Sequence, residues 1–158
     1  MKIFRSIAGI AVGAIVAVIV IMVVETANGF IYPPPDGKTG EEWYKEMMEG
    51  TPAAKEWLRS IPTSTMAMLQ VAWGLGACLG GAVAALIAGR LRLLHAGIIG
   101  ALILAATIYN FYCLKTQLDY AHPDWLIVTG LLLPLPLSLG GGKLVAMLFP
   151  PPTPAAPT

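Results

Sequence analysis

Residues 64–89 read STMAMLQVAWGLGACLGGAVAALIAG, and this stretch decides the class of fold. It holds no charged residue, and as an α-helix it would rise about 39 Å, more than the roughly 30 Å hydrocarbon core of a bilayer. Alanine and glycine recur at every fourth position in two parallel rows. The first row is Ala72, Gly76, Gly80, Ala84 and Ala88, and the second is Ala77, Gly81, Ala85 and Gly89. Because small residues let helices approach closely in lipid, we expect a central transmembrane helix that packs on both rows.

These rows allow two interpretations. In one, they hold the protein's own helices together; in the other, one row binds another membrane subunit. The first is favoured, but the two rows leave room for both. Similar small residues occur in the apolar runs before and after, at Gly9, Gly13 and Ala17 and at Gly97, Ala101 and Ala105.

Three further apolar runs complete the predicted architecture. Hydrophobic residues make up 56% of the 158-residue chain and charged residues 12%, about half the ~25% charged share of a soluble domain. The mean hydropathy is +0.71. The sequence therefore predicts an all-α polytopic membrane protein, with a four-helix transmembrane domain over residues 1–149. The predicted spans are 6–24, 64–89, 93–114 and 125–148, with an outer loop at 25–63 and a proline-rich tail at 150–158.

The first apolar run has an alternative interpretation as a cleaved signal peptide, because Lys2 and Arg5 precede it. Its apolar length exceeds the usual 7–15 residues of a signal sequence. Glu25 also stands where a cleavage site requires a small residue. We expect an uncleaved span.

The charged residues predict the orientation. Alternating spans place five basic residues on each side of the membrane, whereas all nine acidic residues fall on one side, which we call the outer side. Arg90 and Arg92 lie unopposed in a very short turn on the other side. Because basic residues in short loops favour the cytoplasm, we expect both termini to be cytoplasmic.

The outer loop contains signals for two short helices. Thr39 and Glu42 form a capping-box pattern, and Gly50 is a typical helix stop. Thr51-Pro52 then begins a second helix, which Ile61-Pro62 ends.

Polar side chains gather at the outer ends of the predicted spans rather than at their centres. Antiparallel alternation brings Glu25, Asn110 and His122, with Asp124, to one depth. This candidate cluster is either a structural clasp, in which Asp124 caps the fourth span, or a site able to bind a metal or move a proton. The clasp is favoured, because one glutamate and one histidine are too few to predict a metal site. The apolar span centres argue against a proton pump.

The fourth span carries Pro134 and Pro136, followed by three glycines at 140–142. These prolines remove backbone donors and predict a kink. A broken helix can mark a substrate site, but a plain kink is the favoured interpretation.

The order of these motifs resembles that of small four-span bacterial inner-membrane proteins of uncharacterised function. The residues that carry the resemblance are Glu25, Pro33-Pro34-Pro35-Asp36-Gly37, Ile61-Pro62, the glycine-rich second span, Asn110 and His122-Pro123-Asp124-Trp125. It implies a bacterial inner-membrane location and no particular activity.

The first functional hypothesis is a non-catalytic accessory or scaffold subunit of a larger membrane complex, joined through the second span. The alternatives are a small transporter or lipid-binding protein, and a membrane enzyme with a site at the outer rim. We expect the lipid bilayer as a partner. No motif predicts a cofactor, and no basic stripe predicts nucleic-acid binding.

Overall fold

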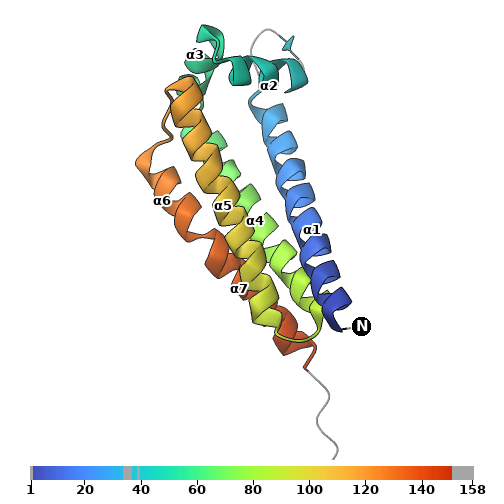
Figure 1. Cartoon of the computed structure of the whole chain (residues 1–158). Helices are drawn as coiled ribbons and strands as arrows, with labels where there is room; N and C mark the ends of the chain where they lie inside the picture. The colour runs from blue at the N-terminus through green and yellow to red at the C-terminus, as the bar shows by residue number, and fades with distance from the viewer. Residues whose placement is uncertain (1, 34–36, 39, 151–158) are drawn as a thin grey trace, which may run out of the picture.

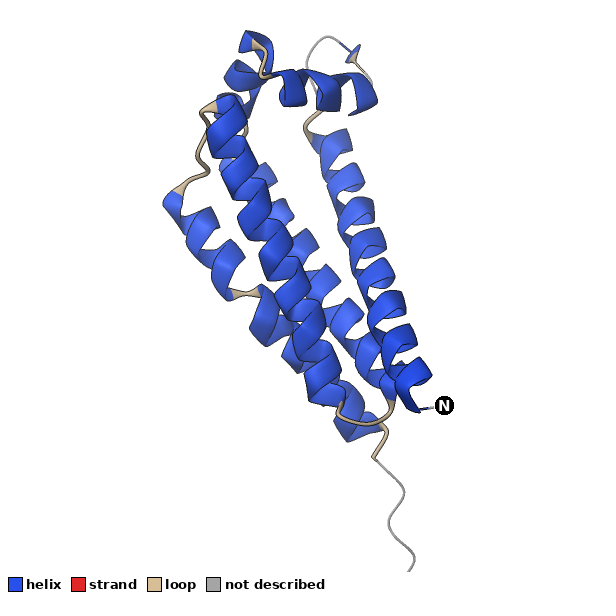
Figure 2. Ribbon diagram, viewed as in Figure 1, coloured by secondary structure: helices blue, strands red, loops and turns tan. Residues whose placement is uncertain are grey.

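The computed structural model describes residues 2–33, 37–38 and 40–150, and within them every regular element is a helix (Figures 1 and 2). The helices are α1 (Lys2–Ile31), α2 (Gly40–Glu49), α3 (Pro52–Ser60), α4 (Thr63–Ala88), α5 (Arg92–Leu118), α6 (Asp124–Leu132) and α7 (Pro134–Leu148). In this part of the chain, four helical stretches are long and apolar enough to cross a membrane: α1, α4, α5, and α6 together with α7. The prediction of an all-helical chain with four candidate spans is thereby confirmed.

Two helices extend further than the charge pattern suggested. Helix α1 continues from Val24 to Ile31, into the region assigned to the outer loop, and α5 continues from Leu114 to Leu118. Charged and polar residues mark where apolar sequence ends, but they do not end a helix. The extra length of α1 is tied down by Asn28, whose Nδ2 donates to the carbonyl oxygen of Thr65 at 3.0 Å.

Helix α4 lies at the centre of the bundle and packs against α1, α5 and α7 (Figure 1). The row that contains Gly80 faces α1, where an added Cβ would lie 2.7 Å from the carbonyl oxygen of Gly13. The row that contains Gly81 faces α7, where an added Cβ would overlap Ser138. Both rows of small residues are therefore taken up by contacts within the chain. All five predicted packing residues, Gly76, Gly80, Gly81, Ala84 and Ala85, are buried.

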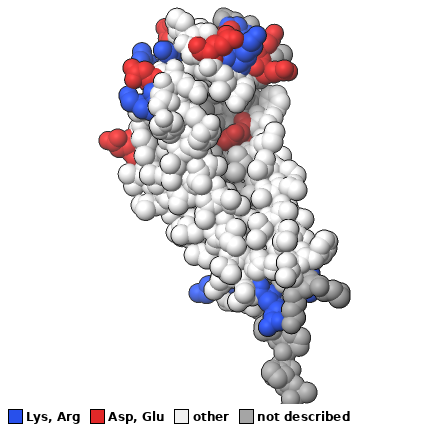
Figure 3. Space-filling view, in the orientation of Figure 1, with Lys and Arg blue, Asp and Glu red and all other residues white. Residues whose placement is uncertain are grey.

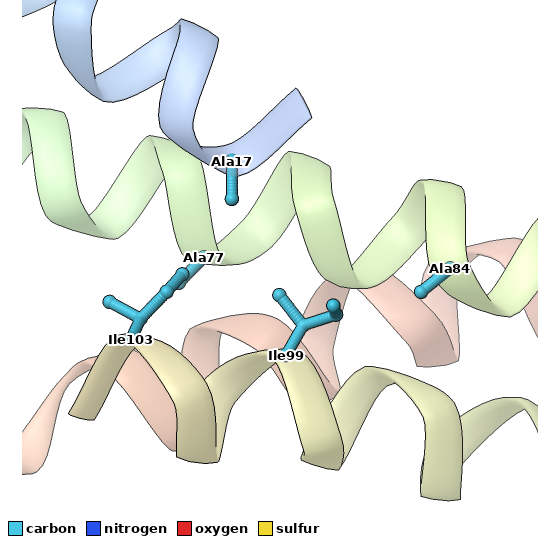
Figure 4. Close-up of a cluster of buried hydrophobic side chains, with 5 residues drawn as sticks. All are labelled: Ala17, Ala77, Ala84, Ile99 and Ile103. Atoms are coloured by element: carbon cyan, nitrogen blue, oxygen red, sulfur yellow. The ribbon is translucent and has the colours of Figure 1, made fainter. Parts of the chain in front are cut away.

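The apolar core at this junction is built from small and branched side chains (Figure 4). Ala17 from α1 meets Ala77 and Ala84 from α4, with Ile99 and Ile103 from α5. Alanine on two of the three helices lets the backbones approach closely, and the isoleucines of α5 fill the remaining space.

Charged residues lie at the two ends of the bundle: acidic and basic residues share the end with α2 and α3, whereas the described charged residues at the other end are basic (Figure 3). At the end opposite α2 and α3, Arg5 donates from Nε and Nη2 to the carbonyl oxygen of Ile87, at 3.2 and 3.0 Å. Arg92 likewise donates to the carbonyl oxygens of Val145, at 3.4 Å, and Phe149. These arginines donate to carbonyls in the last turn of α4 and at the end of α7, where the free carbonyl oxygens of a helix need hydrogen-bond donors and favour positive charge.

The fourth span bends at Leu133, between α6 and α7. Pro134 and Pro136 both lie in the first turn of α7, where a missing N–H leaves no helical hydrogen bond unmade. The bend is held by Ser138, whose Oγ donates to the carbonyl oxygen of Ala96 on α5 at 2.6 Å.

Helices α2 and α3 form a cap over the outer end of the bundle (Figure 1). Thr51 caps α3 by accepting from the backbone N–H of Ala54 at 3.2 Å. Trp43 is 2% exposed and packs edge-on against Trp57, with ring centroids 5.2 Å apart. The predicted capping box includes Thr39, which lies outside the described residues, and all of the predicted tail at 150–158 except residue 150 lies outside them as well.

Candidate functional site

A lateral pocket of about 290 Å³ lies between α1, α4 and α5. Helix α1 packs closely on α4 and touches α5 much less, so an opening is left between α1 and α5 on the side of the bundle. Figure 3 shows this hollow below the cap, with acidic atoms inside it. Glu25 is the acidic residue that lines the pocket.

Most of the pocket wall is apolar, and its space comes from small residues. Ala14 and Ala17 on α1 face Ala106 on α5, while Ile21 and Leu102 enlarge the apolar surface. Because an alanine side chain ends at Cβ, these residues do not fill the space between α1 and α5. Such a surface suits a flexible hydrocarbon chain.

The polar groups of the pocket come together at its outer end. The Oε1 of Glu25 accepts a hydrogen bond from Nε1 of Trp73 on α4 at 3.2 Å. Thr107 and Asn110 project from α5 three residues apart, which places them on one helix face. Thr107 is 4% exposed, whereas Asn110 is exposed at the pocket rim.

The pocket is elongated along the helices. Its lining runs from Ala14 to Glu25 on α1 and from Ile99 to Asn110 on α5. Each wall covers eleven residue-to-residue steps, which corresponds to about 16 Å of helix rise. In Figure 1, α1 and α5 both run toward the cap, so the later residue of each wall lies at the outer end.

The structure brings two members of the predicted cluster to this pocket and leaves the other two outside its lining. Glu25 and Asn110 both line it. His122 instead packs edge-on against the rings of Phe111 and Tyr120, with centroids 5.4 and 5.1 Å away. Burial there lowers the pKa of His122 to about 4. Asp124 is exposed at the first position of α6 and makes no capping hydrogen bond.

Two residues of the polar end were not singled out as site candidates from sequence. Trp73 lies within the glycine-rich span, where an isolated indole gives no sign of a carboxylate partner on another helix. Thr107 stands three residues before Asn110, and this spacing was the available signal. Only the packing of three helices shows that these side chains surround one space.

The described residues contain no group of three His, Cys, Asp or Glu side chains placed to hold a metal ion. Comparison with known proteins finds no matching family model, no matching curated protein and no matching solved structure.

Proposed function

We propose that this protein binds the hydrocarbon chain of an amphiphile in the lateral pocket between α1 and α5. The observation that carries the proposal is the pocket itself, which is apolar along its length and polar at one end. A soluble ligand would need polar groups along the pocket, whereas an amphiphile needs them only at its head. The function is thus lipid binding, alone or as part of transport.

The dimensions of the pocket support an occupant from one leaflet. Twenty residues separate Arg5 from Glu25 in α1, a rise of about 30 Å that equals the hydrocarbon thickness of a bilayer. With Arg5 at one membrane surface, Glu25 lies at the other. The pocket wall of about 16 Å below Glu25 then covers the outer half of the membrane.

The location we propose is the inner membrane of a bacterium, with both termini in the cytoplasm. The unopposed Arg90 and Arg92 between α4 and α5 support this orientation, since short basic loops stay cytoplasmic. The resemblance to small four-span bacterial proteins supports the location.

The accessory-subunit hypothesis and the rim-enzyme hypothesis remain predictions. The first drew on the two small-residue rows of α4, and both rows contact helices of the same chain. The second drew on Glu25, Asn110 and His122 together, and His122 is not part of the pocket lining. We therefore place lipid binding ahead of both.

Filling the pocket tests the proposal. Ala105 and Ala106 are both exposed, but only Ala106 is part of the pocket lining. We expect Ala106→Phe to occupy the pocket and remove bound amphiphile, and Ala105→Phe to point away from it and leave binding intact. The measurement is native mass spectrometry of the full chain released from lipid nanodiscs, with lipid adducts counted for each variant. Equal adduct levels in both variants would contradict the proposal.

A further inference from the structure

We propose that the polar end of the pocket selects an amphiphile whose head group is a primary ammonium. This inference rests on the proposed binding of an amphiphile and adds the chemistry of the head. Three independent features support it: the set of acceptors at the polar end, the charge of the surrounding surface and the depth of the carboxylate.

The acceptors match the three N–H donors of an ammonium group. One oxygen of Glu25 accepts from Trp73, which holds the carboxylate in place and leaves its second oxygen available. Thr107 offers a hydroxyl oxygen and Asn110 a side-chain carbonyl at the same end of the pocket. An ammonium donates three hydrogen bonds and accepts none, so it suits a carboxylate with two neutral acceptors.

The charge of the outer end favours a cation and disfavours an anion. The eight acidic residues that the structure describes all lie on this side, against five basic residues. Among the described residues, the ion pairs of this end are Lys38–Glu46, Lys45–Glu49 and Lys115–Asp119, so none of them neutralises Glu25. Within the part of the chain that the structure describes, no lysine or arginine lines the pocket to hold an acidic head group. An excess of one sign around a cleft raises the local concentration of ligands of opposite charge.

Glu25 lies where the head group of such a ligand would bind, and not along the path of its tail. Its carboxylate closes the outer end of the apolar wall, about 16 Å from Ala14 at the inner end. A carboxylate near hydrocarbon is energetically costly unless it is paired with a cation. A bound ammonium would supply that cation, since none of the ion pairs among the described residues includes Glu25. The tail then lies along Ala14, Ala17 and Ala106.

A competition among lipid head groups tests the inference. The full chain is placed in nanodiscs that contain equal amounts of phosphatidylethanolamine, phosphatidylcholine and phosphatidylglycerol with identical acyl chains. The first carries a primary ammonium, the second a quaternary ammonium without N–H donors, and the third no cation. We expect phosphatidylethanolamine to be enriched about tenfold among adducts in native mass spectrometry, the ratio given by one charge-assisted hydrogen bond.

Glu25→Gln is the deciding variant, because glutamine keeps the size of the side chain and an acceptor for Trp73 while removing the charge. We expect it to abolish the preference for phosphatidylethanolamine without abolishing adducts. Asn110→Leu provides a second variant at an exposed position, where folding is not at risk, and should reduce the preference as well. Three results would overturn the inference. They are equal binding of all three lipids by the wild type, a preference for phosphatidylglycerol, and a preference for phosphatidylethanolamine that survives both substitutions.

The outcomes separate this inference from the proposed function. If Ala106→Phe removes adducts but head groups make no difference, the pocket binds amphiphiles and the ammonium inference fails. If Ala106→Phe removes nothing, the proposed function itself fails. Added dodecylammonium, with dodecanol as its uncharged control, identifies the source of the head group. If dodecylammonium displaces the lipid and dodecanol does not, a free long-chain amine also fits the pocket. If the lipid stays bound in the presence of dodecylammonium, the ligand is an aminophospholipid.

Discussion

Glu25 and His122 are two titratable side chains near the outer end of the bundle, and their neighbours give them different roles. Glu25 faces an open pocket and is held by the indole of Trp73. His122 is 8% exposed and is enclosed by the rings of Phe111 and Tyr120. The first is placed to meet a ligand, and the second is placed to pack.

The packing of His122 predicts a loss of stability in mild acid. The pKa of this imidazole is about 4 in the folded protein, below its ordinary value of 6.5, because burial disfavours the charged form. Above pH 6.5 both states are neutral and the contribution is complete. As the pH falls from 6.5 toward 4, only the unfolded state takes up the proton, so stability falls, by on the order of 2–3 kcal/mol.

The measurement is thermal unfolding of the detergent-solubilised protein between pH 4.5 and 7.5, compared with His122→Phe. Phenylalanine keeps an aromatic ring against Phe111 and Tyr120 but does not titrate, so the variant should lose most of the change in this window. An identical pH dependence in both proteins would show that His122 is not its source.

At the scale of elements, α4 and α7 lie so close together that one methyl group decides whether they fit. A Cβ added at Gly141 would overlap the carbonyl oxygen of Cys78 on α4, whereas a Cβ added at the adjacent Gly140 meets nothing within 4 Å. The two positions share a helix and a residue type, and they differ only in the face they present.

We therefore predict opposite effects for two adjacent glycine-to-alanine substitutions. Gly141→Ala should destabilise the bundle by about 1–3 kcal/mol, because the backbones must separate to admit the methyl group. Gly140→Ala should be neutral or stabilising by up to about 1 kcal/mol, because alanine is the better helix former. Equilibrium unfolding in mixed micelles measures both changes. Equal effects of the two substitutions would contradict the packing of α7 on α4.

The elements also show which helix boundaries follow from local sequence and which depend on tertiary contacts. Thr51 and Pro52 begin α3 as their sequence predicts, because an N-cap and a first-turn proline act within a few residues. The extension of α1 to Ile31 was missed. It depends on Asn28 bonding to α4, a partner 37 residues away that no local pattern reveals.

At the scale of the whole molecule, the uneven distribution of acidic residues between the two ends supports the proposed orientation in the membrane. At the basic end, Arg5 and Arg92 have a structural role besides their charge. Arg5 donates to a carbonyl oxygen of α4, and Arg92 donates to carbonyl oxygens at the end of α7. The acidic residues gather around the cap and the pocket mouth (Figure 3). The proposed orientation is therefore compatible with the helix-end contacts of the two arginines and with the proposed head-group site.

Cysteine labelling checks this orientation. In a background with Cys78 and Cys113 replaced by alanine, Glu56→Cys on the cap should react with a membrane-impermeant maleimide in intact bacterial spheroplasts. Arg90→Cys in the turn between α4 and α5 should react only after the membrane is opened. Both positions are exposed, so access across the membrane is the only difference. The reverse pattern would place the pocket in the cytoplasmic leaflet and contradict the proposed orientation.

The sequence by itself determined the all-helical fold class, the four candidate spans and the glycine-rich central helix, because apolar length, charge placement and residue size are local properties. It also predicted that polar groups gather at one end, and it identified Glu25 and Asn110 among them. Only the tertiary structure decided that these two residues share a pocket while His122 packs elsewhere. The physical reason is that a pocket arises where neighbouring helices touch little: α1 packs closely on α4 and much less on α5, and this arrangement depends on contacts between residues far apart in the chain.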